Sequence, residues 1–308
     1  MPMLSVVIPA YNEEEALMNV IPALSGVLGP EKIDYEIIFI DDGSTDNTYE
    51  KIVELSGASA NVYGYRFSRN FGKESAIWAG LEKANGDCCI VMDCDLQHPP
   101  ETIPQMYRLW EEGYEIVEGI KSNRGKESFF HKVFSKTFYR LIGGLSGLNM
   151  QSSSDFKLLD RRVVTELLQL KEKNAFFRGL SFWVGFNSTK VEYIVNPREH
   201  GKTKWSFLSL IKYAVNNIIG FTTAPLQIVT GVGVILIVAF FVLLIQTFIR
   251  YFLGYSLEGF TTVIILLLLI GGGLMISLGI IGMYIAKIYD EVKNRPRYII
   301  KESTGPRS

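Results

Sequence analysis

Two carboxylates separated by one residue, Asp93 and Asp95, directly follow the apolar run Cys89-Ile90-Val91-Met92. This pattern is typical of a buried strand that carries acidic side chains to the end of a sheet. Mg²⁺ and Mn²⁺ prefer oxygen ligands and often bind through one or two carboxylates plus substrate phosphates. With Gln97 as a further oxygen ligand, the segment predicts a divalent metal site that handles a diphosphate. An acidic surface turn would explain Asp-x-Asp equally well when it is taken alone.

Two further polar clusters follow apolar runs. Asp41 and Asp42 come after residues 35–40, where they could accept hydrogen bonds from a nucleobase and a ribose. Arg69 and Lys73 come after residues 62–67, where they could reach a diphosphate. Each cluster also has a simpler interpretation, as a capped turn and as a solvated basic loop.

The elements that would position these clusters alternate along the chain. Apolar runs at residues 4–9, 35–40, 62–67 and 88–92 predict strands, and the segments between them predict helices, the first capped by Asn12. This alternation predicts an α/β fold with a mostly parallel sheet and helices on both faces. Ligands bind such sheets at the carboxyl ends of the strands, where all three clusters fall.

Composition separates the chain into two parts. The whole chain has 308 residues and a net charge of −1, so we expect no nucleic-acid partner. No charged residue occurs in residues 225–247 or in residues 260–286, and each stretch exceeds the roughly 20 apolar residues that cross a bilayer. Basic residues flank this pair of stretches on its outer sides, which predicts a transmembrane hairpin with both termini and the large domain in the cytoplasm, at the inner (plasma) membrane.

The predicted organisation has six parts. They are a cytoplasmic catalytic domain (1–204), a juxtamembrane amphipathic helix (205–224), a first transmembrane helix (225–250), a short extracytoplasmic loop (251–259), a second transmembrane helix (260–287) and a basic cytoplasmic tail (288–308). A second amphipathic segment is expected at 128–141, and both are typical of helices in the membrane interface, although core-packed helices would fit too. Glycines at 271–273 could allow close helix packing, which leaves homo-oligomerisation open.

The ordered motifs resemble one known family. Val7-Ile8-Pro9-Ala10-Tyr11-Asn12-Glu13-Glu14, Asp41-Asp42-Gly43-Ser44-Thr45-Asp46, Asn70-Phe71-Gly72-Lys73 and Asp93-Cys94-Asp95-Leu96-Gln97-His98-Pro99-Pro100-Glu101 are similar to those of the family 2 inverting glycosyltransferases. These enzymes have the GT-A fold, which is Rossmann-like. Together with the hairpin, the motifs resemble the polyprenyl-phosphate branch of the family, which includes bactoprenol glucosyltransferases and dolichyl-phosphate mannose synthase.

The resemblance implies a role for each matching residue. Those expected to contact the nucleotide-sugar donor are Pro9, Tyr11, Glu13, Asp42 and Lys73, with Arg69 added from its charge. Asp93, Asp95 and Gln97 would hold Mg²⁺ or Mn²⁺, and the catalytic set would be Asp155, Asp95 and Lys73. In relatives, the acidic residue near the sugar is usually given the role of general base. A phosphate monoester is already mostly ionised at neutral pH, so we expect Asp155 to orient the acceptor or to stabilise positive charge on the sugar.

The implied reaction is the inverting transfer of a hexose, from UDP-glucose first of all, to polyprenyl (undecaprenyl) phosphate. The expected product is a β-linked polyprenyl phosphosugar. Candidates for binding the acceptor phosphate or lipid headgroups are Lys121, Arg124, Arg198, Lys202 and Lys204. Alternative donors are GDP-mannose, a UDP-N-acetylhexosamine and an aminoarabinose derivative. Less favoured alternatives are a processive polysaccharide synthase, which would carry more membrane helices, and a non-catalytic membrane sensor of nucleotide sugars.

Overall fold

The structure is a computed structural model that describes residues 2–122, 154–172, 176–194, 223–254 and 259–304. The chain divides into two compact units, one formed by Met1–Ser206 with Pro296–Ser308 and the other by Phe207–Arg295. The predicted amphipathic segment 128–141 lies outside the described residues, as does 205–224 except for its last two residues.

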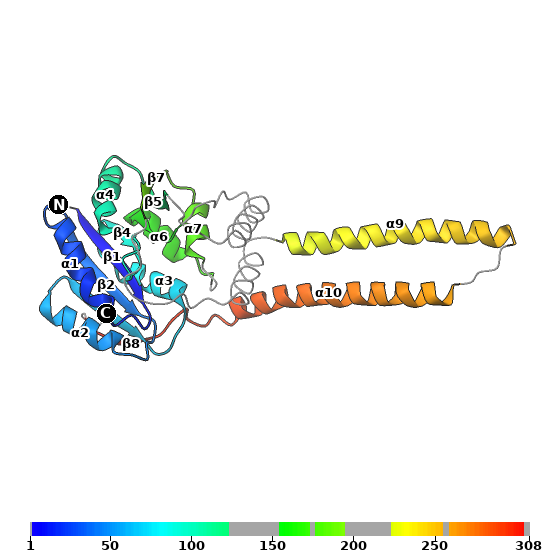
Figure 1. The fold of residues 1–308 in the computed structure, drawn as a ribbon, viewed down its shortest axis with the longest axis horizontal. Helices are drawn as coiled ribbons and strands as arrows, with labels where there is room; N and C mark the ends of the chain where they lie inside the picture. The colour runs from blue at the N-terminus through cyan, green and yellow to red at the C-terminus, as the bar shows by residue number, and fades with distance from the viewer. Residues whose placement is uncertain (1, 123–153, 173–175, 195–222, 255–258, 305–308) are drawn as a thin grey trace. The chain divides into compact units, whose positions relative to one another are not determined.

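The first unit is an α/β domain built on one mixed sheet (Figure 1). In the described part of the chain the strand order is β7-β5-β6-β4-β1-β2-β3-β8. Strands β6 and β8 run antiparallel to their neighbours. The remaining strand pairs are parallel. The strands are β1 (Met3–Ala10), β2 (Asp34–Asp41), β3 (Val62–Phe67), β4 (Cys88–Val91), β5 (Ile116–Lys121), β6 (Lys157–Asp160), β7 (Ser188–Tyr193) and β8 (Ile300–Ser303).

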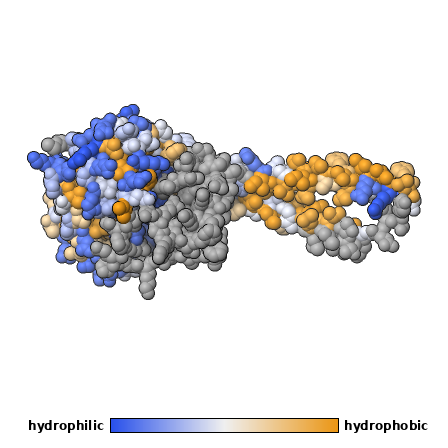
Figure 2. Space-filling view, turned by 45° about the horizontal axis from the view of Figure 1, so that its top comes forward, coloured by the Kyte–Doolittle hydropathy of each residue, from blue (hydrophilic) through white to orange (hydrophobic). Residues whose placement is uncertain are grey.

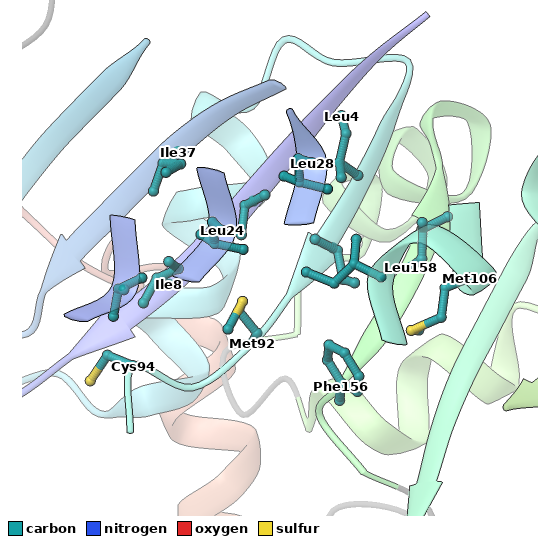
Figure 3. Close-up of a cluster of buried hydrophobic side chains, with 14 of the residues drawn as sticks. Leu4, Ile8, Leu24, Leu28, Ile37, Met92, Cys94, Met106, Phe156 and Leu158 are labelled. Atoms are coloured by element: carbon teal, nitrogen blue, oxygen red, sulfur yellow. The ribbon is translucent and has the colours of Figure 1, made fainter. Parts of the chain in front are cut away.

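Helices pack on the sheet as the alternating pattern predicted. They are α1 (Leu17–Leu28), α2 (Thr48–Ala58), α3 (Lys73–Lys83), the 3₁₀ turn η1 (Pro100–Thr102), α4 (Ile103–Glu111), α6 (Arg161–Gln169) and α7 (Phe177–Trp183). Leu24 and Leu28 of α1 lie with Leu4 and Ile8 of β1 in one buried cluster, and Met106 of α4 lies beside Leu158 of β6 in the same cluster (Figure 3). Helix α3 approaches β1 at Gly80, where an added Cβ would lie 2.2 Å from a methyl group of Val7. The predicted α/β fold class is therefore confirmed.

The start of the first helix was predicted wrongly. Asn12 does not cap a helix, because α1 begins at Leu17 and has no side-chain cap. Asn12 instead adopts φ 53°, a left-handed conformation that asparagine tolerates better than most residues. Its side chain accepts a hydrogen bond from the Thr45 backbone N–H at 2.9 Å, so it connects the loop after β1 to the loop after β2.

The second unit contains two long apolar helices, α9 (Ala224–Phe252) and α10 (Phe260–Val292) (Figure 1). Pro225–Phe252 and Leu269–Val292 are each long and apolar enough to cross a membrane, and apolar side chains form most of their described surface in the view of Figure 2. Since burying this surface in lipid would remove it from water, the pair indicates association with a membrane. The helices extend slightly beyond the predicted spans 225–250 and 260–287.

Residues 300–303 belong to the sheet of the first unit, which the sequence did not predict. Strand β8, within the predicted tail 288–308, pairs antiparallel with β3. The Tyr298 ring stacks on Phe67 at a centroid distance of 5.0 Å, and its hydroxyl donates to Glu82. The Arg297 guanidinium lies 5.1 Å from the centre of the Trp78 ring. Residues 297–304 therefore act as a C-terminal clasp that covers the edge of the sheet at β3.

We expect Tyr298→Ala to destabilise the first unit by about 2 kcal/mol, because it removes an aromatic stack and a hydrogen bond. Thermal unfolding in detergent should show a fall in Tm of roughly 4–8 °C. Ile299→Ala is the matched control, since this side chain is 52% exposed, and it should leave Tm nearly unchanged. Equal effects of the two changes would mean that the clasp does not depend on the Tyr298 contacts.

Candidate active site

The loops that follow β1 and β2 are joined by hydrogen bonds from backbone groups of one to side chains of the other. Asn12 N–H donates to Ser44 Oγ at 2.9 Å, and Glu13 N–H donates to Thr48 Oγ1 at 2.9 Å. Tyr11, the first residue of the loop after β1, is 38% exposed. The structure thus places Tyr11 and Glu13, two of the predicted nucleotide-binding residues, beside the predicted Asp41–Asp42 turn, and Pro9 within β1 next to Ile40 of β2.

The two aspartates of this turn have different surroundings. Asp41 is fully buried, accepts the Ser44 backbone N–H at 2.9 Å and faces Arg66 Nε at 3.3 Å. It therefore shapes the turn. Asp42 accepts the backbone N–H groups of Phe71, at 2.7 Å, and Gly72, at 2.9 Å. This carboxylate joins the loop after β2 to the loop after β3, a role that the sequence did not suggest; its contact with a nucleotide stays a prediction.

Burial raises the pKa of Asp42 to about 6, although the two backbone donors favour its ionised form. The neutral form is a weaker acceptor, so the loop after β3 depends on an ionised Asp42. Arg69 lies on this loop, exposed, with its guanidinium 4.2 Å from the centre of the Phe71 ring. The predicted contact of Arg69 with a diphosphate remains a prediction.

The acidic segment after β4 forms a tight turn. Leu96 has φ 53°, and the Gln97 backbone N–H donates to Asp95 Oδ1 at 3.1 Å. The Asp93 backbone N–H donates to His98 Nδ1 at 3.2 Å. His98 is buried and stacks on Phe156 at 4.9 Å, and burial lowers its pKa, so the imidazole is neutral and its Nδ1 can accept. Cys94 is buried and belongs to the cluster of buried hydrophobic side chains (Figure 3).

Four charged side chains from distant parts of the chain meet beside this turn, and we call them the charge cluster. Lys73 Nζ lies 2.6 Å from Asp93 Oδ1 and 2.8 Å from Asp155 Oδ2. Arg178 contacts Asp155 with two nitrogens, Nε at 2.6 Å and Nη2 at 2.8 Å. Asp155 is only 5% exposed and sits between the two cations. The cluster thus unites predicted residues Lys73, Asp93 and Asp155 with Arg178, which the sequence did not single out.

The charge cluster is fully ionised at neutral pH. Burial alone would raise the pKa of Asp155, but Lys73 and Arg178 hold it well below its usual range. Burial would likewise raise the pKa of Asp93, and Lys73 lowers it. Desolvation would lower the pKa of Lys73, yet the Asp155 and Asp93 carboxylates raise it above its ordinary value. Because its pKa is so low, Asp155 is a poor proton acceptor.

Arg178 and His98 are the site residues that sequence reasoning missed. His98 stands in the Asp-x-Asp motif that was quoted, but its role as an acceptor for Asp93 needs the folded turn. Arg178 lies in the aromatic and apolar segment 176–183 at the start of α7. A lone arginine in such a segment was the available signal, because a buried charge requires a partner.

The predicted acceptor-binding residues fall largely outside the described part of the chain. Arg124, Arg198, Lys202 and Lys204 lie outside the described residues. Lys121 is described: it is exposed at the end of β5, opposite Tyr193 of β7. Its proposed contact with a phosphate stays a prediction.

The residues after β4 fit a divalent cation such as Mg²⁺ or Mn²⁺. Asp93 and Asp95 are partly exposed oxygen donors on one turn. No group of three His, Cys, Asp or Glu side chains that could hold a metal occurs within the described ranges. A cation here would therefore take its remaining ligands from a substrate diphosphate and water, as hard divalent cations commonly do. Gln97 lies on the same turn, and its role as a ligand stays a prediction.

A mostly parallel sheet with acidic and basic side chains at the carboxyl ends of its strands is typical of α/β domains that bind a ligand at that end of the sheet. The family model described as "Glycosyl transferase family 2" matches residues 5–168, and the chain belongs to this family. The full chain is also similar to named members. "Uncharacterized glycosyltransferase YkcC" of Bacillus subtilis is 39% identical, with 98% of this chain and 94% of that protein covered.

Other relatives carry more specific names. "SfII prophage-derived bactoprenol glucosyl transferase" of Shigella flexneri is 35% identical, with 97% of this chain and 98% of that protein covered. Among solved structures, glucosyl-3-phosphoglycerate synthase from Mycobacterium tuberculosis, in complex with Mn²⁺ and UDP-glucose, has a similar fold. Its TM-score is 0.50 and its identity 24%, with 71% of this chain and 77% of that chain covered.

The pKa of Asp42 gives a prediction about the loop after β3. As pH falls from 7.5 to 5, Asp42 takes up a proton near pH 6, and the Phe71 and Gly72 N–H groups lose a charged acceptor. Hydrogen exchange of a peptide covering residues 68–74 should show protection, relative to intrinsic rates, that decreases over this range. Asp42→Asn should show low protection at every pH. Constant protection in the wild type would contradict the assigned contact.

Proposed function

We propose that the protein transfers a hexose from a nucleotide sugar to a polyprenyl phosphate, with inversion at the anomeric carbon. UDP-glucose and undecaprenyl phosphate are the first candidates. The observation that carries the proposal is the charge cluster beside the Asp93–Asp95 turn, in a chain similar over its whole length to proteins named bactoprenol glucosyl transferase. The two apolar helices support a lipid acceptor, because they would keep the domain at a bilayer.

In the proposed reaction, a phosphate oxygen of the acceptor attacks the anomeric carbon of the sugar. The bond from that carbon to the diphosphate breaks, and the nucleoside diphosphate leaves with the electron pair. A divalent cation held by Asp93 and Asp95 would neutralise charge on the leaving group when it is bound. Lys73, which already contacts Asp93, is placed to add a second positive charge there.

Asp155 acts in this proposal as a fixed counter-charge that positions the two cations. Its low pKa and its ion pairs with Lys73 and Arg178 favour this role over that of a general base. The acceptor phosphate has a second pKa near 6, so it needs no base at neutral pH. Arg178, held at the cluster by two contacts, is a candidate to meet a phosphate of the donor or acceptor.

The orientation in the membrane is part of the proposal. Basic residues on the outer flanks of the hairpin favour a cytoplasmic location for the catalytic unit and both termini, at the inner (plasma) membrane.

A transfer assay in detergent tests the proposal. Purified protein, undecaprenyl phosphate and Mg²⁺ or Mn²⁺ are incubated in parallel with radiolabelled UDP-glucose, UDP-N-acetylglucosamine and GDP-mannose. We expect label in the lipid fraction from one donor, and a loss of about 10²-fold or more in Asp95→Ala. Chelation of the metal should have the same effect as Asp95→Ala. Nucleotide binding without transfer from any donor would favour a rarer sugar or the sensor function instead.

The role of Asp155 has its own test. Asp155→Asn should lower kcat by about 10²-fold, the cost of a small misplacement of reacting groups. The loss should be equal from pH 6.5 to pH 9, because Asp155 is ionised throughout this range in the wild type. In both proteins kcat should decline below about pH 6 as the acceptor phosphate takes up a proton. Recovery of Asp155→Asn at high pH would instead show that Asp155 is the general base.

A further inference from the structure

A second set of polar side chains is buried next to the charge cluster. It connects the segment that carries Asp155 to the segment that carries Arg178. Glu118 of β5 and Lys157 of β6 form an ion pair at 3.2 Å. Lys157 also donates to Ser181 Oγ of α7 at 2.8 Å. Their exposed fractions are 9% for Glu118, 2% for Lys157 and 0% for Ser181. We call these three residues the buried triad.

Glu118 and Ser181, the two ends of the buried triad, each form a hydrogen bond with a backbone group at or next to a charge-cluster residue. Glu118 accepts the backbone N–H of Ser154 at 3.2 Å, directly before Asp155. Ser181 donates to the backbone carbonyl of Arg178 at 3.2 Å. The triad thus fixes the segment that carries Asp155 and the helical turn that carries Arg178, and it connects the two through one lysine.

Stability alone gives a weak reason for a buried ion pair. Removing two charges from water is costly, and apolar side chains of similar volume are often as stable in such a position. What an apolar pair cannot provide is a set of directional hydrogen bonds to Ser154 and Ser181. Asp155 and Arg178 come from different elements, and their contacts of 2.6 and 2.8 Å leave little tolerance for movement.

We propose that Glu118, Lys157 and Ser181 are positioning residues, which hold Asp155 and Arg178 in register so that the charge cluster forms. This inference rests on the proposed function for its activity test. None of the three is expected to touch a substrate, because all three are buried and act through backbone groups of Ser154 and Arg178.

Two variants test the triad with little risk to folding. Ser181→Ala removes the connection to α7 and leaves the Glu118–Lys157 pair intact. Glu118→Gln/Lys157→Met removes both charges, keeps the side-chain volumes and keeps an oxygen that can accept from Ser154. We expect kcat to fall roughly 10-fold in Ser181→Ala and roughly 10- to 100-fold in the double variant, with the donor KM within about twofold of the wild type.

The matched control is Arg162→Ala. This change removes another ion pair next to β5, between Arg162 and Glu115 at 3.1 Å, in which the Arg162 side chain is 77% exposed. Activity and Tm should be unchanged in the control. Unchanged kcat in a folded double variant, judged by a Tm close to that of the wild type, would overturn the proposal.

Coupling to Arg178 separates positioning from a general loss of stability. If Ser181 acts through Arg178, then adding Ser181→Ala to Arg178→Lys should cost less in kcat than it costs in the wild-type background. Full additivity of the two changes would contradict the mechanism.

One readout does not depend on the transfer reaction. Hydrogen exchange should be faster in peptides covering 154–160 and 176–183 of the double variant, and unchanged in peptides covering α1. If the wild type transfers no sugar, the proposed function fails, while this exchange pattern still tests the triad. No change in exchange at either peptide would overturn the triad even where transfer is found.

Discussion

The site depends on one carboxylate. Asp155 is almost completely buried, and such a charge is tolerated only because Lys73 and Arg178 contact it at 2.6 to 2.8 Å. This requirement brings together the first residue of α3, the turn before β6 and the start of α7. Because Lys73 also contacts Asp93, it connects the Asp155 carboxylate to the turn that fits a divalent cation. Loss of Asp155 would leave two cations without their common partner.

The sheet supplies the frame for this constraint. Parallel strands β1, β2, β3 and β4 end at one edge, so the loops that follow them meet there. Hydrogen bonds then join these loops in pairs: Asn12 with Thr45, and Asp42 with Phe71 and Gly72. Strand β6 enters antiparallel next to β4 and thereby places Asp155 beside Asp93. The buried triad supports the segments that carry Asp155 and Arg178. The C-terminal clasp contacts Trp78 and Glu82 of α3.

The clasp follows the second apolar helix in the sequence and forms part of the catalytic sheet. Strand β8 begins eight residues after α10 ends, and it pairs with β3, whose following loop carries Arg69. A chain that leaves the sheet for the two apolar helices therefore returns to the same sheet. In the proposed function this arrangement suits an enzyme whose acceptor is a lipid phosphate, because the first unit is connected along the chain to both helices of the hairpin.

The sequence alone determined the α/β class and the two apolar helices. It also determined the strands that are followed by the polar clusters at Asp41–Asp42, Arg69–Lys73 and Asp93–Asp95. These features follow from local hydrophobic patterns and from segment length, which are readable in one dimension. Only the tertiary structure decided that Asp42 supports the loop after β3, that Arg178 completes the charge cluster and that β8 closes the sheet. Asp42 and Phe71 are 29 residues apart in the sequence, and Asp155 and Arg178 are 23 residues apart. Gly64 of β3 and Thr304, which follows β8, are separated by 240 residues. Contacts of this kind leave no periodic trace in sequence, because they form only when distant segments pack against each other.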